Sequence, residues 1–268
     1  MLPLRSVTLA NSRPSGFPFD VPAIAALESL HFDSPVTCFV GENGSGKSTL
    51  LEALAWAAER VAAGSEGLDR DESLGHVRAL GDALRLTWSR RTRRGFFLRA
   101  EDFFGWVKTT RTRMTDLARE AEKASRGAAA AGAHEGEQDR VAAPFRGSLA
   151  AMTDRYGENP DAASHGEQFL AFFKSRFVPG GLYLLDEPEA PLSPQSQLAF
   201  VALLKELTET ADAQFVIATH SPIVMATPGA TLLSFDSHPP ATVAWEDVEH
   251  VALLRDFLRN PEAFLRHL

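Results

Sequence analysis

Two neighbouring polar residues have the types and the setting needed to hold the phosphates of a nucleotide. Lys47 and Ser48 close the pattern G-x-x-x-x-G-K-[ST], in which the fixed glycines are Gly41 and Gly46. The ammonium group can neutralise the β- and γ-phosphates, and the hydroxyl can ligate Mg²⁺. The residues predicted to form this phosphate-binding loop are Gly41, Glu42, Asn43, Gly44, Ser45, Gly46, Lys47, Ser48 and Thr49.

The segments that flank the loop predict a buried strand before it and a helix after it. The apolar run 36–40 precedes the loop, and the amphipathic run 50–56 follows it. Glycines allow successive backbone N–H groups to point inward at an anion, and a helix that begins near Lys47 adds the positive end of its dipole. A glycine-rich turn of this kind can also bind nothing. Both flanking elements favour a nucleoside triphosphate site.

Two carboxylates follow a second apolar run, at 182–185. Asp186 and Glu187 stand where this predicted strand ends, and that end of a parallel strand lies beside the phosphate loop. Asp186 is predicted to hold Mg²⁺ opposite Ser48, directly or through water. Glu187 is predicted to polarise the attacking water as a general base. An isolated Asp-Glu-Pro can be no more than a helix start, but the preceding strand favours the catalytic interpretation.

His220 and Ser164 are candidates for contacts with the γ-phosphate. His220 ends a strand predicted over 214–218, where an imidazole could orient the attacking water; a lone histidine there is otherwise a structural residue. Ser164 and Gly166 stand at the start of a helix predicted over 165–177, which makes a second anion site. One subunit already has a phosphate loop, so the second site suggests contact with a nucleotide held by a partner subunit.

The composition is that of a globular protein. The 268 residues, of which 44% are hydrophobic and 23% charged, suit one α/β domain with an insertion or two modest lobes. Cys38 is the single cysteine, which excludes an intramolecular disulfide and fits a reducing compartment. No apolar run approaches the length of a membrane span, and the N-terminus lacks the apolar region of a signal peptide. We therefore expect a soluble, cytoplasmic protein without membrane insertion.

Positive charge is concentrated in one segment of an acidic chain. The formal net charge is −8, which argues against wholesale coating of nucleic acid. Residues 85–113 nevertheless contain nine basic side chains against Glu101 and Asp102. The pattern indicates either a surface for DNA or another nucleic acid, or a solvated hairpin edge whose charges discourage strand pairing. The nine are Arg85, Arg90, Arg91, Arg93, Arg94, Arg99, Lys108, Arg111 and Arg113.

The remaining elements are predicted from periodicity and from turn and capping residues. Helices are predicted over 22–30, 101–123, 193–210 and, as two short pieces, 247–268. Strands are predicted over 4–9, 231–235, 241–245 and, joined by an arginine-rich turn, 83–90 and 95–100. The stretch 125–144 is predicted to be flexible, although an alanine-rich helix is an alternative. No heptad run is visible, which excludes a long coiled-coil arm.

Taken together, the motifs resemble the ATP-binding-cassette (ABC) class of ATPases in order and in spacing. The likeness is to stand-alone ATPases of the SMC, RecF and OLD-type branch, which are AAA family ATPases in the broad sense. It is carried by 41–49, Ser-His-Gly-Glu-Gln at 164–168, 182–188 and Thr-His-Ser-Pro at 219–222. The resemblance implies an α/β P-loop NTPase with a mostly parallel central sheet, an antiparallel N-terminal β part and an inserted helical lobe. Residues 1–100 and 181–268 would form the nucleotide-binding lobe, and 101–180 the helical lobe.

The resemblance also implies roles for the candidate residues. Lys47 and Ser48 become the Walker A pair, Asp186 the Walker B aspartate, Glu187 the catalytic glutamate and His220 the switch histidine. Ser164 and Gly166 match the signature sequence, which faces the partner's nucleotide in a head-to-tail homodimer that encloses ATP and Mg²⁺. The segment 191–193 falls where the family has its D-loop.

The chain departs from the family pattern in two places. His165 replaces the first glycine of the signature, and Glu167 follows the second. No glutamine ends the strand after the arginine-rich turn; Glu101 is the candidate for that position and the third candidate metal ligand, after Ser48 and Asp186. The missing glutamine argues against the soluble motor of a membrane transporter. The candidate biological roles are DNA repair and phage defence, and the motifs do not distinguish between them. The candidates for stacking on adenine are Arg13, Phe17 and Phe19.

Overall fold

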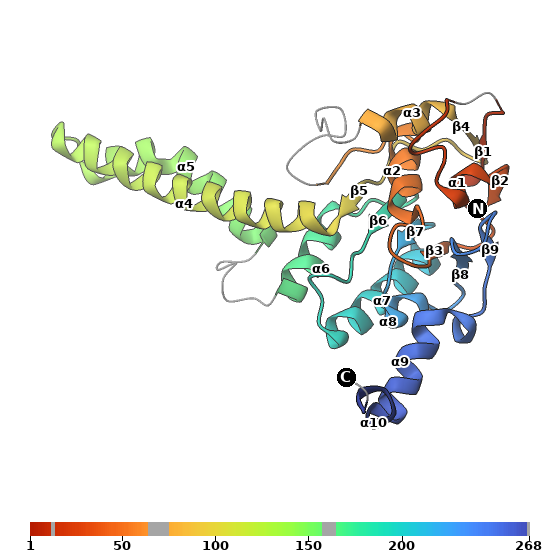
Figure 1. The fold of residues 1–268 in the computed structure, drawn as a ribbon. Coiled ribbons are helices and arrows are strands. Elements are labelled where there is room, and N and C mark those ends of the chain that lie inside the picture. Colours follow the sequence, from red (N-terminus) through yellow and green to blue (C-terminus); the bar gives the residue numbers. More distant parts are fainter. Residues whose placement is uncertain (12–13, 64–74, 157–164, 267–268) are drawn as a thin grey trace. The chain divides into compact units, whose positions relative to one another are not determined.

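The computed structural model describes residues 1–11, 14–63, 75–156 and 165–266 and divides the chain into two compact units (Figure 1). The first unit is Met1–Ala100 together with Phe177–Leu268, and the second is Glu101–Arg176. The second unit thus ends before the predicted boundary at residue 180. Within the described residues, no helix is long and apolar enough to cross a membrane.

The first unit is organised around a six-stranded sheet. Its strand order is β5-β6-β7-β3-β8-β9, and every neighbouring pair is parallel except β8 and β9. Every residue of β3, β6 and β7 is buried, as expected of strands covered on both faces. The bounds are β3 Val36–Val40, β5 Phe97–Arg99, β6 Leu182–Asp186, β7 Gln214–Ala218, β8 Thr231–Ser234 and β9 Ala241–Thr242.

A three-stranded antiparallel sheet forms the N-terminal part of the same unit. Its order is β2-β1-β4, with β1 at Leu4–Leu9, β2 at Ser29–His31 and β4 at Leu84–Trp88. The buried amide of Gln214 on β7 joins the two sheets, since it accepts from the N–H of Leu4 at 2.8 Å and donates to the carbonyl of Leu4 at 2.9 Å. The α/β class, the mostly parallel sheet and the antiparallel N-terminal part are therefore confirmed.

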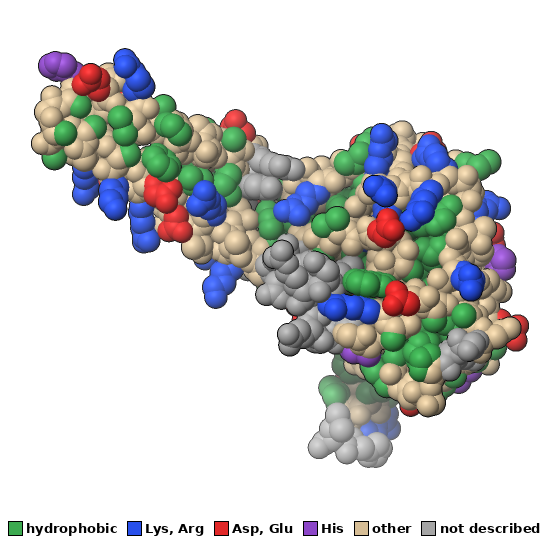
Figure 2. Space-filling model, turned by 90° about the horizontal axis from the view of Figure 1, so that it is seen from above, with side chains coloured by type: hydrophobic (Ala, Val, Ile, Leu, Met, Phe, Trp, Pro, Cys, Tyr) green, Lys and Arg blue, Asp and Glu red, His purple; other side chains and the backbone are tan. Residues whose placement is uncertain are grey.

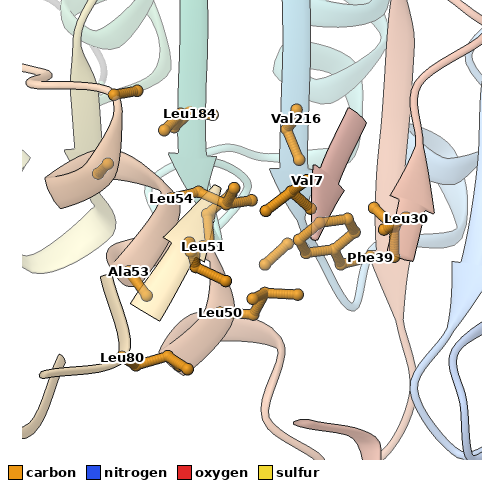
Figure 3. Close-up of a cluster of buried hydrophobic side chains, with 14 of the residues drawn as sticks. Val7, Leu30, Phe39, Leu50, Leu51, Ala53, Leu54, Leu80, Leu184 and Val216 are labelled. Atoms are coloured by element: carbon orange, nitrogen blue, oxygen red, sulfur yellow. The ribbon is translucent and has the colours of Figure 1, made fainter. Parts of the chain in front are cut away.

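Helix α2, at Lys47–Ala57, lies between these two sheets (Figure 3). Leu50, Leu51 and Leu54 on this helix are fully buried. They share one hydrophobic cluster with Val7 and Leu30 of the small sheet and Phe39, Leu184 and Val216 of the large sheet. Apolar packing on both sides fixes the helix, and with it the loop at its N-terminus.

The other helices of the first unit complete its layers. They are α1 Pro22–Ala25, α3 Gly75–Ala83, α7 Pro194–Thr210, α8 Pro222–Met225, α9 Glu249–Arg259 and α10 Pro261–Leu265, with a 3₁₀ turn, η2, at Trp245–Asp247. Ser193 caps α7 by accepting from the N–H of Ser196, as the sequence predicts.

Two sequence-based predictions about local structure are wrong. The helix predicted over 22–30 ends at Ala25, because 29–31 instead pairs with β1 and buries Leu30. The segments 83–90 and 95–100 are not a hairpin: β4 pairs with β1, whereas β5 runs parallel to β6 in the other sheet. Phe97 and Leu98 are buried in that central sheet, a burial that a solvated hairpin edge could not supply.

Gly95 lies where the chain passes from β4 in the small sheet to β5 in the large sheet. Its φ is +107°, and a Cβ there would lie 1.9 Å from the carbonyl oxygen of Leu182. Gly95→Ala combines an unfavourable backbone conformation with overlap against rigid backbone, so we expect it to lower the free energy of unfolding by more than about 2 kcal/mol. Chemical denaturation checks this, with Gly127→Ala as control, because a Cβ at Gly127 meets nothing within 4 Å. Equal stability of the two variants would contradict the prediction.

The second unit contains a pair of long helices. Helix α4 spans Ala100–Ala130 and α5 spans Glu135–Tyr156, and Figure 1 shows α5 returning along α4. Gly132, with φ of +83°, ends α4: the N–H groups of Gly132 and Ala133 donate to the carbonyls of Ala129 and Ala128, both at 3.0 Å. This is the Schellman arrangement that glycine allows.

The predictions of a flexible 125–144 stretch and of no coiled-coil arm are therefore wrong. On α4 the buried residues recur at alternating steps of four and three, at Thr110, Met114, Leu117 and Ala121. On α5 the partly or fully buried residues follow the same spacing, at Gln138, Ala142, Phe145, Leu149 and Met152. This is the heptad seam of paired helices. Thr110, Ala121, Gln138 and Ala142 interrupt the apolar residues of this seam, so the sequence alone shows no continuous heptad run.

An aromatic cluster joins α4 to the third helix of this unit, α6 at His165–Arg176. The ring of Phe103 lies 5.2 Å from that of Phe169 and 5.7 Å from that of Phe172. Trp106 lies 4.5 Å from Phe172, and the guanidinium of Arg176 lies 4.6 Å from the Phe172 ring. The second unit thus has a core of its own.

Candidate functional site

The loop between β3 and α2 has the backbone geometry of an anion-binding turn. Gly41, Gly44 and Gly46 have φ values of +136°, +80° and +101°. A Cβ at Gly41 would lie 2.8 Å from Oδ1 of Asp236, and a Cβ at Gly46 would lie 2.9 Å from Cγ1 of Val21. Glycine is therefore required at both fixed positions, by conformation and by space.

Lys47 reaches across the loop. Its side chain is buried, with 5% exposed, and Nζ donates to the carbonyls of Gly41 at 2.8 Å and Glu42 at 2.7 Å. Burial lowers the pKa of this ammonium group, while the charges of Asp236, Asp186, Glu187 and Glu42 oppose that shift. No side chain caps the N-terminus of α2, so the helix dipole and the ammonium group both face the loop.

Ser48 and Asp186 meet beside Lys47. The Ser48 hydroxyl donates to Oδ1 of Asp186 at 2.9 Å, which joins the first turn of α2 to the end of β6. Burial raises the pKa of the Asp186 carboxyl to about 7; the Ser48 hydrogen bond opposes this, and nearby Glu52, Glu187 and Glu189 add to it. A buried carboxylate among other acids is a place where a cation is stabilising.

The Ser48–Asp186 pair fits Mg²⁺. Among the described residues, no group of three or more His, Cys, Asp or Glu side chains could hold a metal alone. Mg²⁺ commonly takes one or two protein oxygens and completes its shell with phosphate oxygens and water. One hydroxyl and one carboxylate beside a phosphate loop match that requirement.

The raised pKa of Asp186 predicts a pH dependence. The folded protein binds this proton more tightly than the unfolded chain, whose carboxyl has a pKa of 3.8, so Asp186 lowers the free energy of unfolding as pH rises towards 7. In nucleotide-free protein, Asp186→Asn removes this dependence. We expect the difference in melting temperature between Asp186→Asn and wild type to grow from acidic pH up to pH 7 and then to level off. A constant difference would show that Asp186 does not titrate in this range.

Glu187 and His220 face each other at the ends of neighbouring strands. Glu187 has φ of +48°, and its N–H donates to the carbonyl of Ala218 at 2.9 Å. Its Oε1 lies 4.0 Å from Nε2 of His220. Burial and then the charge of Lys47 lower the pKa of His220, while Glu187 opposes this, so the imidazole is held neutral near pH 7. A carboxylate and a neutral imidazole are thus paired beside the loop.

Two acidic side chains contribute to the site without having been predicted. The half-buried Glu189 carboxylate accepts from the N–H groups of His220 at 2.8 Å and Ser221 at 3.1 Å, which positions the histidine. Asp236, just after β8, accepts from the N–H of Glu42 at 2.8 Å and so holds the loop. The sequence offers a weak signal for Glu189, a second acid close to Glu187, and none for Asp236.

Comparison with protein families agrees with this geometry. A model described as "AAA domain" matches residues 23–76, and one described as "AAA domain, putative AbiEii toxin, Type IV TA system" matches residues 108–226. The two matches together take in more than half of the chain. The chain is an AAA-type P-loop NTPase. No curated protein matches it.

Solved structures similar to this P-loop NTPase include head domains and a transporter cassette. One is the Smc head domain of Pyrococcus furiosus with an extended coiled coil, bound to the C-terminal domain of ScpA, at 13% identity and a TM-score of 0.45 over 96% of this chain and 100% of that one. The SMC head domain of Thermotoga maritima has 17% identity and a TM-score of 0.43 over 90% and 98%. A nucleotide-free ATP-binding cassette from an ABC transporter has 15% identity and a TM-score of 0.43 over 100% and 99%.

Two of the remaining candidates are not part of the loop's own unit. Gly166, near the start of α6, and Glu101, in the first turn of α4, belong to the second unit of the NTPase. Ser164 lies outside the described residues, as does Arg13. Their predicted contacts with nucleotide stay predictions.

The two aromatic candidates for stacking on adenine, Phe17 and Phe19, differ in exposure. Phe19 is 6% exposed and belongs to the hydrophobic core, which removes it as a candidate. Phe17 is 58% exposed, with its ring 4.8 Å from that of His76. Of the pair, Phe17 is the one with a free aromatic surface.

Proposed function

We propose that the chain binds ATP with Mg²⁺ and hydrolyses it as an ABC-type ATPase. The observation that carries the proposal is the convergence of two side-chain pairs beside Lys47: Ser48 with Asp186, and Glu187 with His220. Asp186, Glu187 and His220 come from the carboxyl ends of the adjacent strands β6 and β7 and from the loops after them. Ser48 comes from the first turn of α2, which follows the neighbouring strand β3 through the phosphate loop. Phosphoryl transfer requires mainly positioning and charge neutralisation, and this arrangement offers both.

Each side chain has a defined task in this proposal. Lys47 and the loop N–H groups hold the β- and γ-phosphates, and Ser48 and Asp186 hold the Mg²⁺ that neutralises charge on them. Glu187 takes a proton from the attacking water while the water oxygen bonds to the γ-phosphorus. The bond from that phosphorus to the β–γ bridging oxygen breaks, and ADP leaves with the electron pair. His220, held through its backbone by Glu189, orients the γ-phosphate and the water.

We further propose that the active form is a homodimer in which Ser164 and Gly166 of one copy complete the nucleotide site of the other. This rests on the signature-like sequence at the start of α6 and on the family resemblance. A chain that hydrolyses ATP only as a dimer acts as a switch, because nucleotide controls whether two copies are joined.

Concentration dependence of the rate tests the dimer. The ATPase rate per subunit should rise with protein concentration until dimerisation saturates. Glu187→Gln should accumulate as a dimer when ATP and Mg²⁺ are present, and as a monomer when either is withheld, measured by light scattering after size exclusion. A rate per subunit that is independent of concentration, with no ATP-dependent change in mass, would overturn the dimer. That result would not contradict the proposal that the chain hydrolyses ATP.

A further inference from the structure

A loop between the two sheets of the first unit carries four arginines within five residues. Residues 90–94 read Arg-Arg-Thr-Arg-Arg and follow β4. All four arginines are exposed, whereas Thr92 between them is buried. Together with Gly180 they line a surface hollow of about 400 Å³. The guanidinium groups therefore surround a space that a ligand can enter.

A buried guanidinium holds this arginine loop in place from beneath. Arg60 is 5% exposed, and its Nη1 donates to the carbonyl of Arg94 at 2.6 Å. Its Nη2 donates to the carbonyls of Thr92 at 2.5 Å and Ala58 at 2.7 Å, and its Nε donates to Ala58 at 2.9 Å. A planar fork that joins two loop carbonyls to the end of α2 fixes the loop backbone before any ligand arrives.

Two further contacts restrict the loop from the side. Nη1 of Arg94 donates to the carbonyl of Pro179 at 3.1 Å. Gly95, which ends the loop, lies so close to the backbone of Leu182 that it has no room for a Cβ. The arginine side chains thus extend from a rigid frame, and binding would not require the loop backbone to become ordered.

The positive charge of the loop is largely unbalanced by acidic side chains. Arg91 pairs with Glu59 at 3.2 Å, with both side chains mostly exposed. For Arg90, Arg93 and Arg94 no carboxylate partner is present among the described residues. Like charges held this close repel one another, and an anion would relieve that repulsion. Because the whole chain carries −8, a polyanion is repelled elsewhere and directed to this loop.

The structure shows that the basic residues predicted from the sequence to form one surface differ in their surroundings. Arg99 pairs with Glu52 at 3.6 Å and is little exposed. Lys108, Arg111 and Arg113 are on α4, in the second unit. Figure 2 shows Lys and Arg side chains (blue) along the helical unit as well as on the first unit. The segment 85–113 is therefore divided between the two units, and the arginine loop is its densest part.

We propose that the Arg90–Arg94 loop binds the phosphate backbone of nucleic acid, independently of ATP. Guanidinium forks match phosphate oxygens bidentately. Five residues span at most about 17 Å, a length that meets several phosphates of a duplex. A single phosphate would need an enclosing set of N–H groups, whereas an open hollow edged by four cations suits a repeating polyanion. Contacts of this kind carry no base sequence, so the binding is non-specific.

Salt dependence of binding to duplex DNA tests the proposal. The measurement is fluorescence anisotropy of a labelled duplex of mixed sequence, over a series of salt concentrations. Replacing Arg90, Arg93 and Arg94 with alanine should weaken binding by at least about 10-fold at low salt and reduce the slope of log K against log salt by about 3. The matched control replaces Lys108, Arg111 and Arg113 with alanine, which removes the same charge from α4. An equal loss in both variants, or no loss in the loop variant, would overturn the proposal.

Arg60→Lys tests whether the hydrogen bonds from Arg60 to the carbonyls of the arginine loop contribute to DNA binding. It keeps the charge and all four surface arginines but loses the fork, so it should weaken DNA binding several-fold with little change in salt slope. If Arg60→Lys changed neither the melting temperature nor the affinity for DNA, the hydrogen bonds from Arg60 would not be needed to hold the loop for binding.

Competition with poly-glutamate distinguishes nucleic acid from an acidic protein. If poly-glutamate competed as well as unlabelled DNA at equal charge, the partner would be an acidic protein and the assignment to nucleic acid would be overturned. Lys47→Ala should lose ATP binding yet keep DNA binding, so failure here is distinct from failure of the proposed ATPase.

Discussion

Replacing Glu187 with glutamine is expected to slow ATP turnover by about 10²–10⁴-fold while ATP affinity is retained. Glu187 directly follows Asp186 at the end of β6, and its carboxylate lies 4.0 Å from the neutral His220 imidazole. Glutamine keeps the size and hydrogen-bonding reach of the side chain but cannot accept a proton from water. The phosphate loop, which makes the binding contacts, is untouched.

Single-turnover hydrolysis and equilibrium binding of ATP separate the two effects. Glu206→Gln is a matched control, since Glu206 is an exposed residue on α7 and the change in charge is the same. We expect Glu206→Gln to behave as wild type in both measurements. If Glu187→Gln turned over ATP within a few-fold of wild type, Glu187 would not be the base. A comparable loss of ATP affinity would instead place Glu187 in binding.

Lys47→Ala is expected to weaken ATP binding by about 100-fold or more, and to abolish hydrolysis at ordinary ATP concentrations. Hydrogen bonds to a charged group contribute about 1.5–3 kcal/mol each, and an ammonium group between the β- and γ-phosphates makes at least two. Burial lowers the pKa of Lys47, while the charges of the acids around the site oppose that shift.

Lys47 also stabilises the nucleotide-free loop. Its removal leaves the carbonyls of Gly41 and Glu42 without their donor, so the melting temperature should fall as well. Lys205→Ala, on the exposed face of α7, controls for the loss of a lysine. Isothermal titration with ATP and Mg²⁺ measures affinity, and differential scanning calorimetry measures stability. Unchanged affinity for ATP in Lys47→Ala would exclude the loop as the triphosphate site.

The chemistry of the site was largely readable from the amino-acid sequence. The phosphate loop is contiguous, and its glycines, lysine and serine are required by local backbone geometry and by the charge of the ligand. Asp186, Glu187 and His220 each follow a short apolar run, and runs of that kind become buried parallel strands. Local signals sufficed because each of these residues occupies a strand end, and the carboxyl ends of parallel strands meet at one edge.

The tertiary structure decided which segments lie beside one another. That β5 pairs with β6 and β4 with β1 depends on burial against residues distant in sequence, which turn residues and alternation cannot reveal. The same holds for the polar partners: Glu189 finds the N–H groups of His220 and Ser221, and Asp236 that of Glu42, only once β3, β6, β7 and β8 are aligned. The α4–α5 pair was missed because polar and small residues interrupt the apolar positions of its seam. Sequence thus indicated the candidate catalytic groups, whose requirements are local. The fold determined the residues that support them, because packing and pairing join residues that local propensity does not relate.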